Sequence, residues 1–258
     1  MVVKNQKIMN QKLKALAKNY IPWIKPIWHK TRSIANAPFF ALSYTKPWLG
    51  LSNPKIFVIG RNKTGTTSLK QVLTDLGYKV GNQRSAELLM EDWAKRDFRR
   101  LIRYCHSADA FQDVPFSYHY TFQAMDAAFP GSKFILSVRN SADEWYQSVV
   151  RFHAKRLEKR TGEKRIPTLE DIQRDPYVYP GYLWRVRQLV GVAGGGYPEA
   201  ALKAYYQRHN DIVTDYFRHR PDDLLVLNLA EHDAMQKLCA LLGKLYDDRQ
   251  MPKLNVSK

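Results

Sequence analysis

A polar loop bounded by glycines is the first group of residues whose types and spacing indicate chemistry. Residues 60–68 read GRNKTGTTS, and they lie between a short apolar run, 55–60, and an amphipathic segment, 66–76. In a strand–loop–helix unit, the backbone N–H groups of such a loop and the positive end of the helix dipole converge on one point, which binds phosphate. The loop has the GxxxxG frame of a nucleotide-triphosphate loop, but Thr66 occupies the position where that motif requires lysine.

A second arrangement for binding an anion is predicted at Arg139, which directly follows the apolar run 133–138. An arginine at the carboxyl end of a strand offers a planar, permanently charged donor to phosphate. Ser148 lies about two turns into the next helix, which Ser141 and Glu144 begin as a capping box, and its hydroxyl would lean back toward the same anion. Alternatively, Arg139 pairs with a neighbouring carboxylate and Ser148 is an ordinary serine on the helix surface.

Together these motifs resemble the two signatures of the sulfotransferases that use 3′-phosphoadenosine 5′-phosphosulfate (PAPS). The run 63–67, KTGTT, resembles the loop that binds the 5′-phosphosulfate. Residues 134–148, FILSVRNSADEWYQS, resemble the second signature, in which an arginine ends a strand and a serine follows in the next helix. The resemblance is to the compact P-loop sulfotransferases common in bacteria and covers residues 54–256. It is weak at residues 160–197, so it defines the acceptor less well than the donor.

The resemblance implies both the reaction and the residues that take part. The sulfuryl group of PAPS would pass to a hydroxyl or amine of the acceptor by in-line displacement, 3′,5′-ADP (PAP) would be the product, and no metal ion would be required. Lys63 would be catalytic, because it would contact the phosphate oxygens on which negative charge develops. The residues that would bind the donor are Arg61, Lys63, Thr64, Gly65, Thr66, Thr67, Ser68, Arg139 and Ser148.

The reaction also needs a base to remove the proton of the acceptor hydroxyl, and Asp113 is the leading candidate. It follows the stretch 104–111 in an Asp-x-Pro turn, which would close the cleft opposite the loop if the intervening strand is parallel. The pKa of a carboxylate in this role must be raised by partial desolvation, whereas His119 or His106 would need no such change. Because Asp-x-Pro is also a common turn sequence, these three side chains stay open as alternatives.

The elements that must position these motifs are short strands that alternate with amphipathic helices. The apolar runs that predict strands are 55–60, 133–138 and 224–229, and helical spacing is found at 66–76, from 142 onward and at 198–220. In a parallel sheet covered on both faces, ligands bind at the carboxyl ends of the strands. The predicted fold is therefore α/β, a three-layer P-loop-type parallel sheet flanked by helices, with a basic N-terminal extension. Residues 160–197 predict an excursion that is either a surface loop or a lid over the acceptor site.

The positive charge of the chain is concentrated at its start. Its 258 residues include 41 Lys and Arg against 24 Asp and Glu, a formal net charge of +17, which favours anionic partners. No acidic residue precedes Asp75, and residues 1–53 combine lysine with aromatic residues and prolines. We therefore predict a basic, aromatic-rich N-terminal extension at 1–53 and a P-loop sulfotransferase-like domain at 54–258. The extension either docks on the domain or binds an anionic membrane surface through residues 1–50.

The sequence also predicts where the protein works. Cys105 and Cys239 lie far apart, so neither a disulfide framework nor a zinc site is indicated. No apolar run reaches the roughly 18 to 20 residues that span a bilayer, and the start lacks the pattern of a cleaved leader. These features predict a cytoplasmic enzyme, which is peripheral on the inner membrane face if the extension binds lipid.

Two other functions share parts of this pattern. A P-loop kinase or phosphotransferase has the same loop frame, but the chain lacks a clear strand that ends in aspartate for Mg²⁺. A non-catalytic nucleotide- or nucleic-acid-binding protein would fit the net charge, but its aromatic residues should form a platform, whereas many here follow helical core spacing. We expect no nucleic acid partner. A glycan, a glycolipid, a phenol and a small alcohol are all compatible acceptors.

Overall fold

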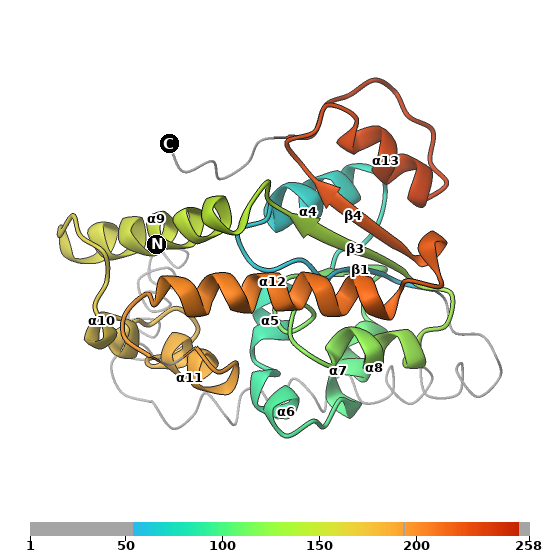
Figure 1. The fold of residues 1–258 in the computed structure, drawn as a ribbon. Coiled ribbons are helices and arrows are strands. Elements are labelled where there is room, and N and C mark those ends of the chain that lie inside the picture. The colour runs from blue at the N-terminus through green and yellow to red at the C-terminus, as the bar shows by residue number, and fades with distance from the viewer. Residues whose placement is uncertain (1–53, 193, 253–258) are drawn as a thin grey trace, which may run out of the picture. The chain divides into compact units, whose positions relative to one another are not determined.

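The computed structural model describes residues 54–192 and 194–252, which form a mixed α/β fold (Figure 1). The strands of this part are β1 (Ile56–Val58), β2 (Ala110–Gln112), β3 (Lys133–Val138) and β4 (Leu224–Asn228). They form one parallel sheet in the order β2-β1-β3-β4. The carboxyl ends of all these strands therefore lie at the same edge of the sheet. The predicted N-terminal extension, residues 1–53, lies outside the described residues.

Helices connect the strands and cover both faces of the sheet. They are α4 (Thr66–Asp75), α5 (Gln83–Glu87), α6 (Met90–Ala94), α7 (Arg99–Cys105), α8 (Thr121–Ala128), α9 (Ala142–Thr161), α10 (Leu169–Arg174), α11 (Tyr182–Leu189), α12 (Glu199–Tyr216) and α13 (Ala234–Leu241). A short 3-10 helix, η1 (Pro221–Asp223), precedes β4. Within the described ranges, no helix combines the length and the apolar character needed to cross a bilayer.

The side chains of β1 divide the core into two layers, because successive residues of a strand point to opposite faces. Ile56 and Val58 pack with buried residues of α4 and α13. Phe57 packs on the other face with buried residues of α7, α8 and α12. In Figure 1, α4 and α13 accordingly lie on one side of the strands, and α7 and α8 lie on the other. The predicted three-layer α/β arrangement is confirmed.

Phe57 also helps to set the register of the sheet. It pairs with Phe111 of β2 on one side and with Phe134 of β3 on the other. The ring centroids are 5.8 Å and 5.4 Å apart, and both pairs are stacked. Because cross-strand aromatic pairs favour one alignment of neighbouring strands, this row of rings keeps the ends of β1, β2 and β3 level. The parallel strand that the position of Asp113 required is therefore present as β2.

The start of α9 forms only half of the predicted capping box. Oγ of Ser141 accepts a hydrogen bond from the backbone N–H of Glu144 at 3.0 Å, as such a box requires. The carboxylate of Glu144 does not return to Ser141. It accepts from the backbone and side-chain amides of Asn140, at 3.2 Å and 2.7 Å, and from Arg139 at 3.2 Å. Instead of the second hydrogen bond of a capping box, the carboxylate of Glu144 thus forms an ion pair with Arg139.

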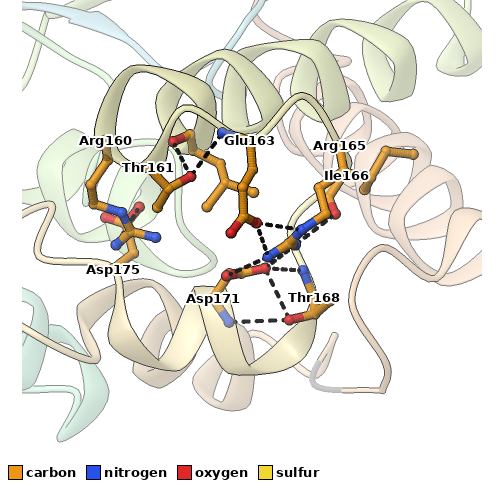
Figure 2. Close-up of polar contacts among 9 residues, drawn as sticks. Arg160, Thr161, Glu163, Arg165, Ile166, Thr168, Asp171 and Asp175 are labelled. Atoms are coloured by element: carbon orange, nitrogen blue, oxygen red, sulfur yellow. Dashed lines mark hydrogen bonds and ion pairs between the residues drawn. The ribbon is translucent and has the colours of Figure 1, made fainter.

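The excursion at 160–197 contains α10 and α11, so its interpretation as a plain surface loop is wrong. Ion pairs hold the connection from α9 to α10 (Figure 2). Nε of Arg165 donates to Glu163 at 2.7 Å, and its guanidinium also contacts Asp171. Asp171 and Thr168 form a reciprocal capping box at the start of α10. Charged residues near the start of the excursion, Glu163, Arg165 and Asp171, are thus used in this local network.

Candidate active site

The loop after β1 begins and ends at glycines that no larger residue can replace. A Cβ atom on Gly60 would lie 2.1 Å from Oγ of Ser137 on β3, so only glycine lets the strand ends approach this closely. Gly65 has a left-handed φ of +100°, and a Cβ atom there would lie 2.5 Å from Leu229. Gly65 directly precedes α4, whose first N–H groups have no partner within the helix. The loop therefore directs this end of α4 as a phosphate site requires.

Arg139 connects the loop to the second predicted corner, after β3. Its Nε donates a hydrogen bond to the backbone carbonyl of Lys63 at 2.8 Å, and its Nη1 pairs with Glu144 at 3.2 Å. Nε1 of Trp145, on α9, donates to the carbonyl of Asn62 at 2.9 Å. The two corners therefore lie side by side. Arg139 has a carboxylate partner, as the alternative interpretation expected, and it also lines the cavity described below.

Two loop residues that were predicted to bind the donor have interior partners. The buried Thr64 hydroxyl donates to the carbonyl of Arg61 and lies 2.6 Å from Oγ of Ser137. Arg61 is 1% exposed; it donates to the carbonyl of Ser117, and its guanidinium lies 3.8 Å from the centroid of the Tyr205 ring. Neither Arg61 nor Thr64 lines the cavity. In this structure both support the loop, and their contact with a donor stays a prediction.

A cavity of about 360 Å³ brings most of the other predicted residues together. The predicted residues that line it are Lys63, Gly65, Thr66, Thr67, Asp113 and Arg139. Ser68 and Ser148 are buried, and neither is part of the lining. Ser148 lies on α9 at 6% exposure, so it is not a helix-surface serine, and its contact with an anion stays a prediction.

The rest of the lining is mainly aromatic and aliphatic. It comes largely from α9, α11, α12 and the segments next to them, and Val114 and Tyr118 come from the segment between β2 and α8. Its largest side chains are Tyr118, Trp145, Phe152, Tyr177, Tyr182 and Tyr205. The excursion thus forms part of the wall, which is where a lid would have to lie. The lining also includes Glu87, His153, Arg156 and Arg187, which were not predicted to take part. No motif marks them, and three lie in or beside the region where the family resemblance is weak.

Lys63 lies among groups that disfavour its charge. Its ammonium group is 4.1 Å from the centroid of the Phe152 ring. Burial lowers the pKa of Lys63, the positive charge of Arg139 lowers it further, and Asp113 opposes the shift. An anion bound between Lys63 and Arg139 would relieve their repulsion.

Asp113 follows β2 in the left-handed region, with a φ of 62°, and its carboxylate is held at both oxygens. Oδ1 accepts from the N–H of Val114 at 2.8 Å, and Oδ2 accepts from the hydroxyl of Thr66 at 3.3 Å. Burial raises the pKa of Asp113 to about 6, and the charge of Glu87 acts in the same direction. The shift outweighs the opposing effect of Lys63 and of the two hydrogen bonds. Such a carboxylate is ionised at neutral pH and is a stronger base than an exposed aspartate.

The alternative bases, His119 and His106, do not line the cavity. His119 lies 3.5 Å from a guanidinium nitrogen of Arg61. Burial and nearby arginines lower the pKa of His119 to about 4. The ring of His106 packs edge-on against Phe129, 5.3 Å between centroids. Among the described residues, no group of three or more His, Cys, Asp and Glu side chains is arranged to hold a metal ion.

The site thus combines a loop that leads into the start of α4, a lysine and a partly desolvated carboxylate on one cavity. A comparison with curated proteins found no match. A family model described as a sulfotransferase domain matches residues 55–258, which is most of the chain. The chain therefore belongs to the sulfotransferase domain family.

Proposed function

We propose that the chain transfers the sulfuryl group of PAPS to a hydroxyl group of an acceptor. The observation that carries this proposal is the convergence of the loop, Lys63 and Asp113 on one cavity beside the start of α4. Membership of the sulfotransferase family supports sulfuryl transfer in general, and it implies a nucleotide donor and an acceptor. The KTGTT loop and its neighbour Arg139 support PAPS as that donor.

The residues present fit the anionic groups of this donor. The left-handed glycine at position 65 lets the loop turn directly into α4, whose first N–H groups would bind a 5′-phosphate, and Lys63 supplies a cation beside it. Arg139 supplies a second cation for the 3′-phosphate, with Ser148 of the same signature nearby in the chain. The PAP product would keep both phosphates, so PAP should bind the same residues.

Each catalytic residue has one task in the proposed reaction. Asp113 accepts the proton of the acceptor hydroxyl while the hydroxyl oxygen forms its bond to sulfur. The bond between sulfur and the bridging phosphate oxygen breaks, and Lys63 stabilises the negative charge that stays on that oxygen. A donor directed at developing charge in this way contributes about 2.7–4 kcal/mol to transition-state stability. The proton therefore ends on Asp113 and the leaving group is PAP.

Two measurements test this function. PAP without Mg²⁺ should raise the thermal unfolding midpoint strongly, whereas ATP should raise it little. Incubation with ³⁵S-labelled PAPS and a fractionated cell extract should give a labelled product in a lipid, polysaccharide or small-molecule fraction. Stabilisation by ATP with Mg²⁺ and none by PAP would instead favour a kinase, and PAP binding without any labelled product would favour a non-catalytic binding protein.

A separate proposal concerns residues 1–53, which lie outside the described residues. We infer from their sequence alone that they hold the enzyme at an anionic membrane surface, on the cytoplasmic side. Their lysines would pair with anionic headgroups, and their tryptophans and phenylalanines would enter the interface.

A further inference from the structure

A buried arginine without a carboxylate partner lines the cavity on the side formed by α11. Arg187 is 7% exposed. Its Nη1 donates to the carbonyl of Gly196, and its guanidinium lies 4.4 Å from the centroid of the Tyr197 ring. Within residues 54–192 and 194–252, no Asp or Glu forms an ion pair with it, and burial lowers the pKa of Arg187. Because a buried cation without an anion is costly, this position favours a ligand that supplies negative charge.

The other two arginines of the lining are already paired. Arg139 pairs with Glu144 at 3.2 Å, and Arg156 pairs with Asp175 at 2.8 Å. Arg187 differs from both, although it is the most deeply buried of the three. Its positive charge is therefore available to a ligand in the cavity.

Unpaired polar atoms lie in the same part of the lining. Nδ1 of His153 and Nε of Arg156 are buried and have no hydrogen-bond partner in the described part of the chain. Burial, together with the charges of Arg187, Arg156 and Lys63, lowers the pKa of His153 to about 3. His153 is therefore a neutral imidazole surrounded by cations, and it can hydrogen-bond to an anionic group without adding charge of its own.

Between these polar groups the lining is apolar. Val149 and Phe152 come from α9, and Leu183 and Val186 come from α11. The cavity thus has three parts that could contact an acceptor. Lys63 and Asp113 lie where its hydroxyl would react, Arg187 and its polar neighbours could bind an anionic group, and the apolar wall could pack against the rest of the acceptor.

We propose that the acceptor is a hydroxyl compound with an apolar, aromatic body and an anionic group, and that Arg187 binds this anionic group. His153 and Arg156 lie beside Arg187 and contribute hydrogen bonds to the same group. The proposal rests on the sulfotransferase function above and narrows its acceptor from any hydroxyl compound to an anionic amphiphile.

Matched acid and ester acceptors test the proposal in the wild-type enzyme. The probes are 4-hydroxyphenylacetate, 3-(4-hydroxyphenyl)propionate and 4-(4-hydroxyphenyl)butyrate, each beside its methyl ester. Methylene groups separate the carboxylate from the ring, so the acidity of the phenol is nearly the same in acid and ester. In at least one pair, kcat/KM for sulfation should be about tenfold or more higher for the acid, as a charged hydrogen bond predicts. Equal or better turnover of the ester in all three pairs overturns the proposal.

Variants of α11 test the assignment to Arg187. In R187Q the acid and the ester should be turned over equally well, and R187K should restore part of the preference. R185Q is the matched control, because Arg185 lies on the same helix and pairs at the surface with Glu91. R185Q should keep the full preference, and an R187Q enzyme that also keeps it contradicts the assignment. If R187Q does not fold, the acid and ester comparison in the wild type still decides the proposal.

A ligand that cannot react separates this inference from the proposed function. 3-Phenylpropionate has the anionic group but no hydroxyl, so its binding does not depend on sulfuryl transfer. It should stabilise the wild-type and R185Q proteins saturably in thermal unfolding and should not stabilise R187Q. Stabilisation by PAP with none by 3-phenylpropionate would leave the sulfotransferase function standing and overturn the anion site. Stabilisation by 3-phenylpropionate with no response to PAP and no sulfation would support the anion site and overturn the sulfotransferase function.

Discussion

The Nε atom of Arg139 donates a hydrogen bond to the backbone carbonyl of Lys63 at 2.8 Å, across 76 positions of sequence. This bond joins the corner after β1 to the corner after β3, because the two strands are parallel neighbours. The same guanidinium pairs with Glu144 at the start of α9. Arg139 therefore both fixes the backbone of the loop and presents positive charge to the cavity.

Replacement of Arg139 by alanine should weaken PAP binding by roughly 10- to 100-fold, because a charged hydrogen-bond donor is lost and the loop is freed at Lys63. Isothermal titration calorimetry with PAP measures the effect. R151A is the control, because Arg151 is an exposed residue of α9 outside the cavity, and its affinity should equal that of the wild type. An unchanged affinity in R139A would remove Arg139 from the donor site.

Replacement of Lys63 by alanine should reduce the rate of sulfuryl transfer about 10²- to 10³-fold, because the charge on the leaving oxygen is no longer stabilised. The protein should stay folded, since burial already disfavours the charged form of Lys63. Single-turnover transfer from ³⁵S-labelled PAPS and a thermal unfolding curve together measure both effects. K70A, at an exposed position of α4, should behave as the wild type. Normal transfer by K63A would show that another group stabilises the leaving oxygen.

The parts of the site that the sequence predicts are those that one local segment encodes. The loop at 60–68 contains its own glycines, its lysine and the start of its helix, so its pattern is visible without any tertiary information. Arg139 is visible for the same reason, because it ends an apolar run of strand length. Their meeting at one edge follows from the parallel sheet, and the strand pairing confirms it.

The remaining parts depend on contacts between distant segments. β2 spans only three residues, too few for a periodic pattern, so the placement of Asp113 was conditional on it. Glu87 and Arg187 reach the cavity through the packing of α5 and α11, which no motif encodes. Arg61 and Thr64 belong to the motif, but their burial depends on Ser117 and Ser137 in other elements. A motif thus predicts well which residues lie near a ligand. It predicts less well which of those residues face the ligand.

Removal of residues 1–50 should abolish binding to anionic vesicles, because these residues carry 9 of the 17 excess positive charges and no acidic residue. Sedimentation with vesicles of phosphatidylcholine, with and without phosphatidylserine, measures this. The full chain should sediment only with the anionic vesicles, and added salt should release it. PAP binding by the trimmed protein is the control for folding. Equal binding to neutral and anionic vesicles, or no binding by the full chain, would exclude the membrane role.

The pH dependence of transfer identifies the base. With a pKa of about 6 for Asp113 in the free enzyme, kcat/KM should rise with pH, reach half of its maximum near pH 6 and become constant well above that pH, because only the ionised carboxylate accepts a proton. If His119 were the base, the rise would lie near pH 4, since the pKa of His119 is about 4. Asp113→Asn should lose the rise and lower the plateau by about 10²- to 10⁴-fold. H119Q should keep both.

The carboxylate of Asp113 should also make the stability of the fold depend on pH. The protonated form stabilises the fold, whereas the ionised form is the one needed for catalysis. Because the folded-state pKa of Asp113 is raised above its usual value of 3.8, the stability contributed by its protonated form is complete below pH 3.8. That contribution is lost as the pH rises through about 6. Asp113→Asn stays neutral and keeps an oxygen for the N–H of Val114, so at pH 8 it should unfold at a higher temperature than the wild type. At pH 4 the difference should be much smaller. A lower unfolding temperature for Asp113→Asn at pH 8 would mean that the charge of Asp113 stabilises the fold, and burial would then not be what sets its pKa.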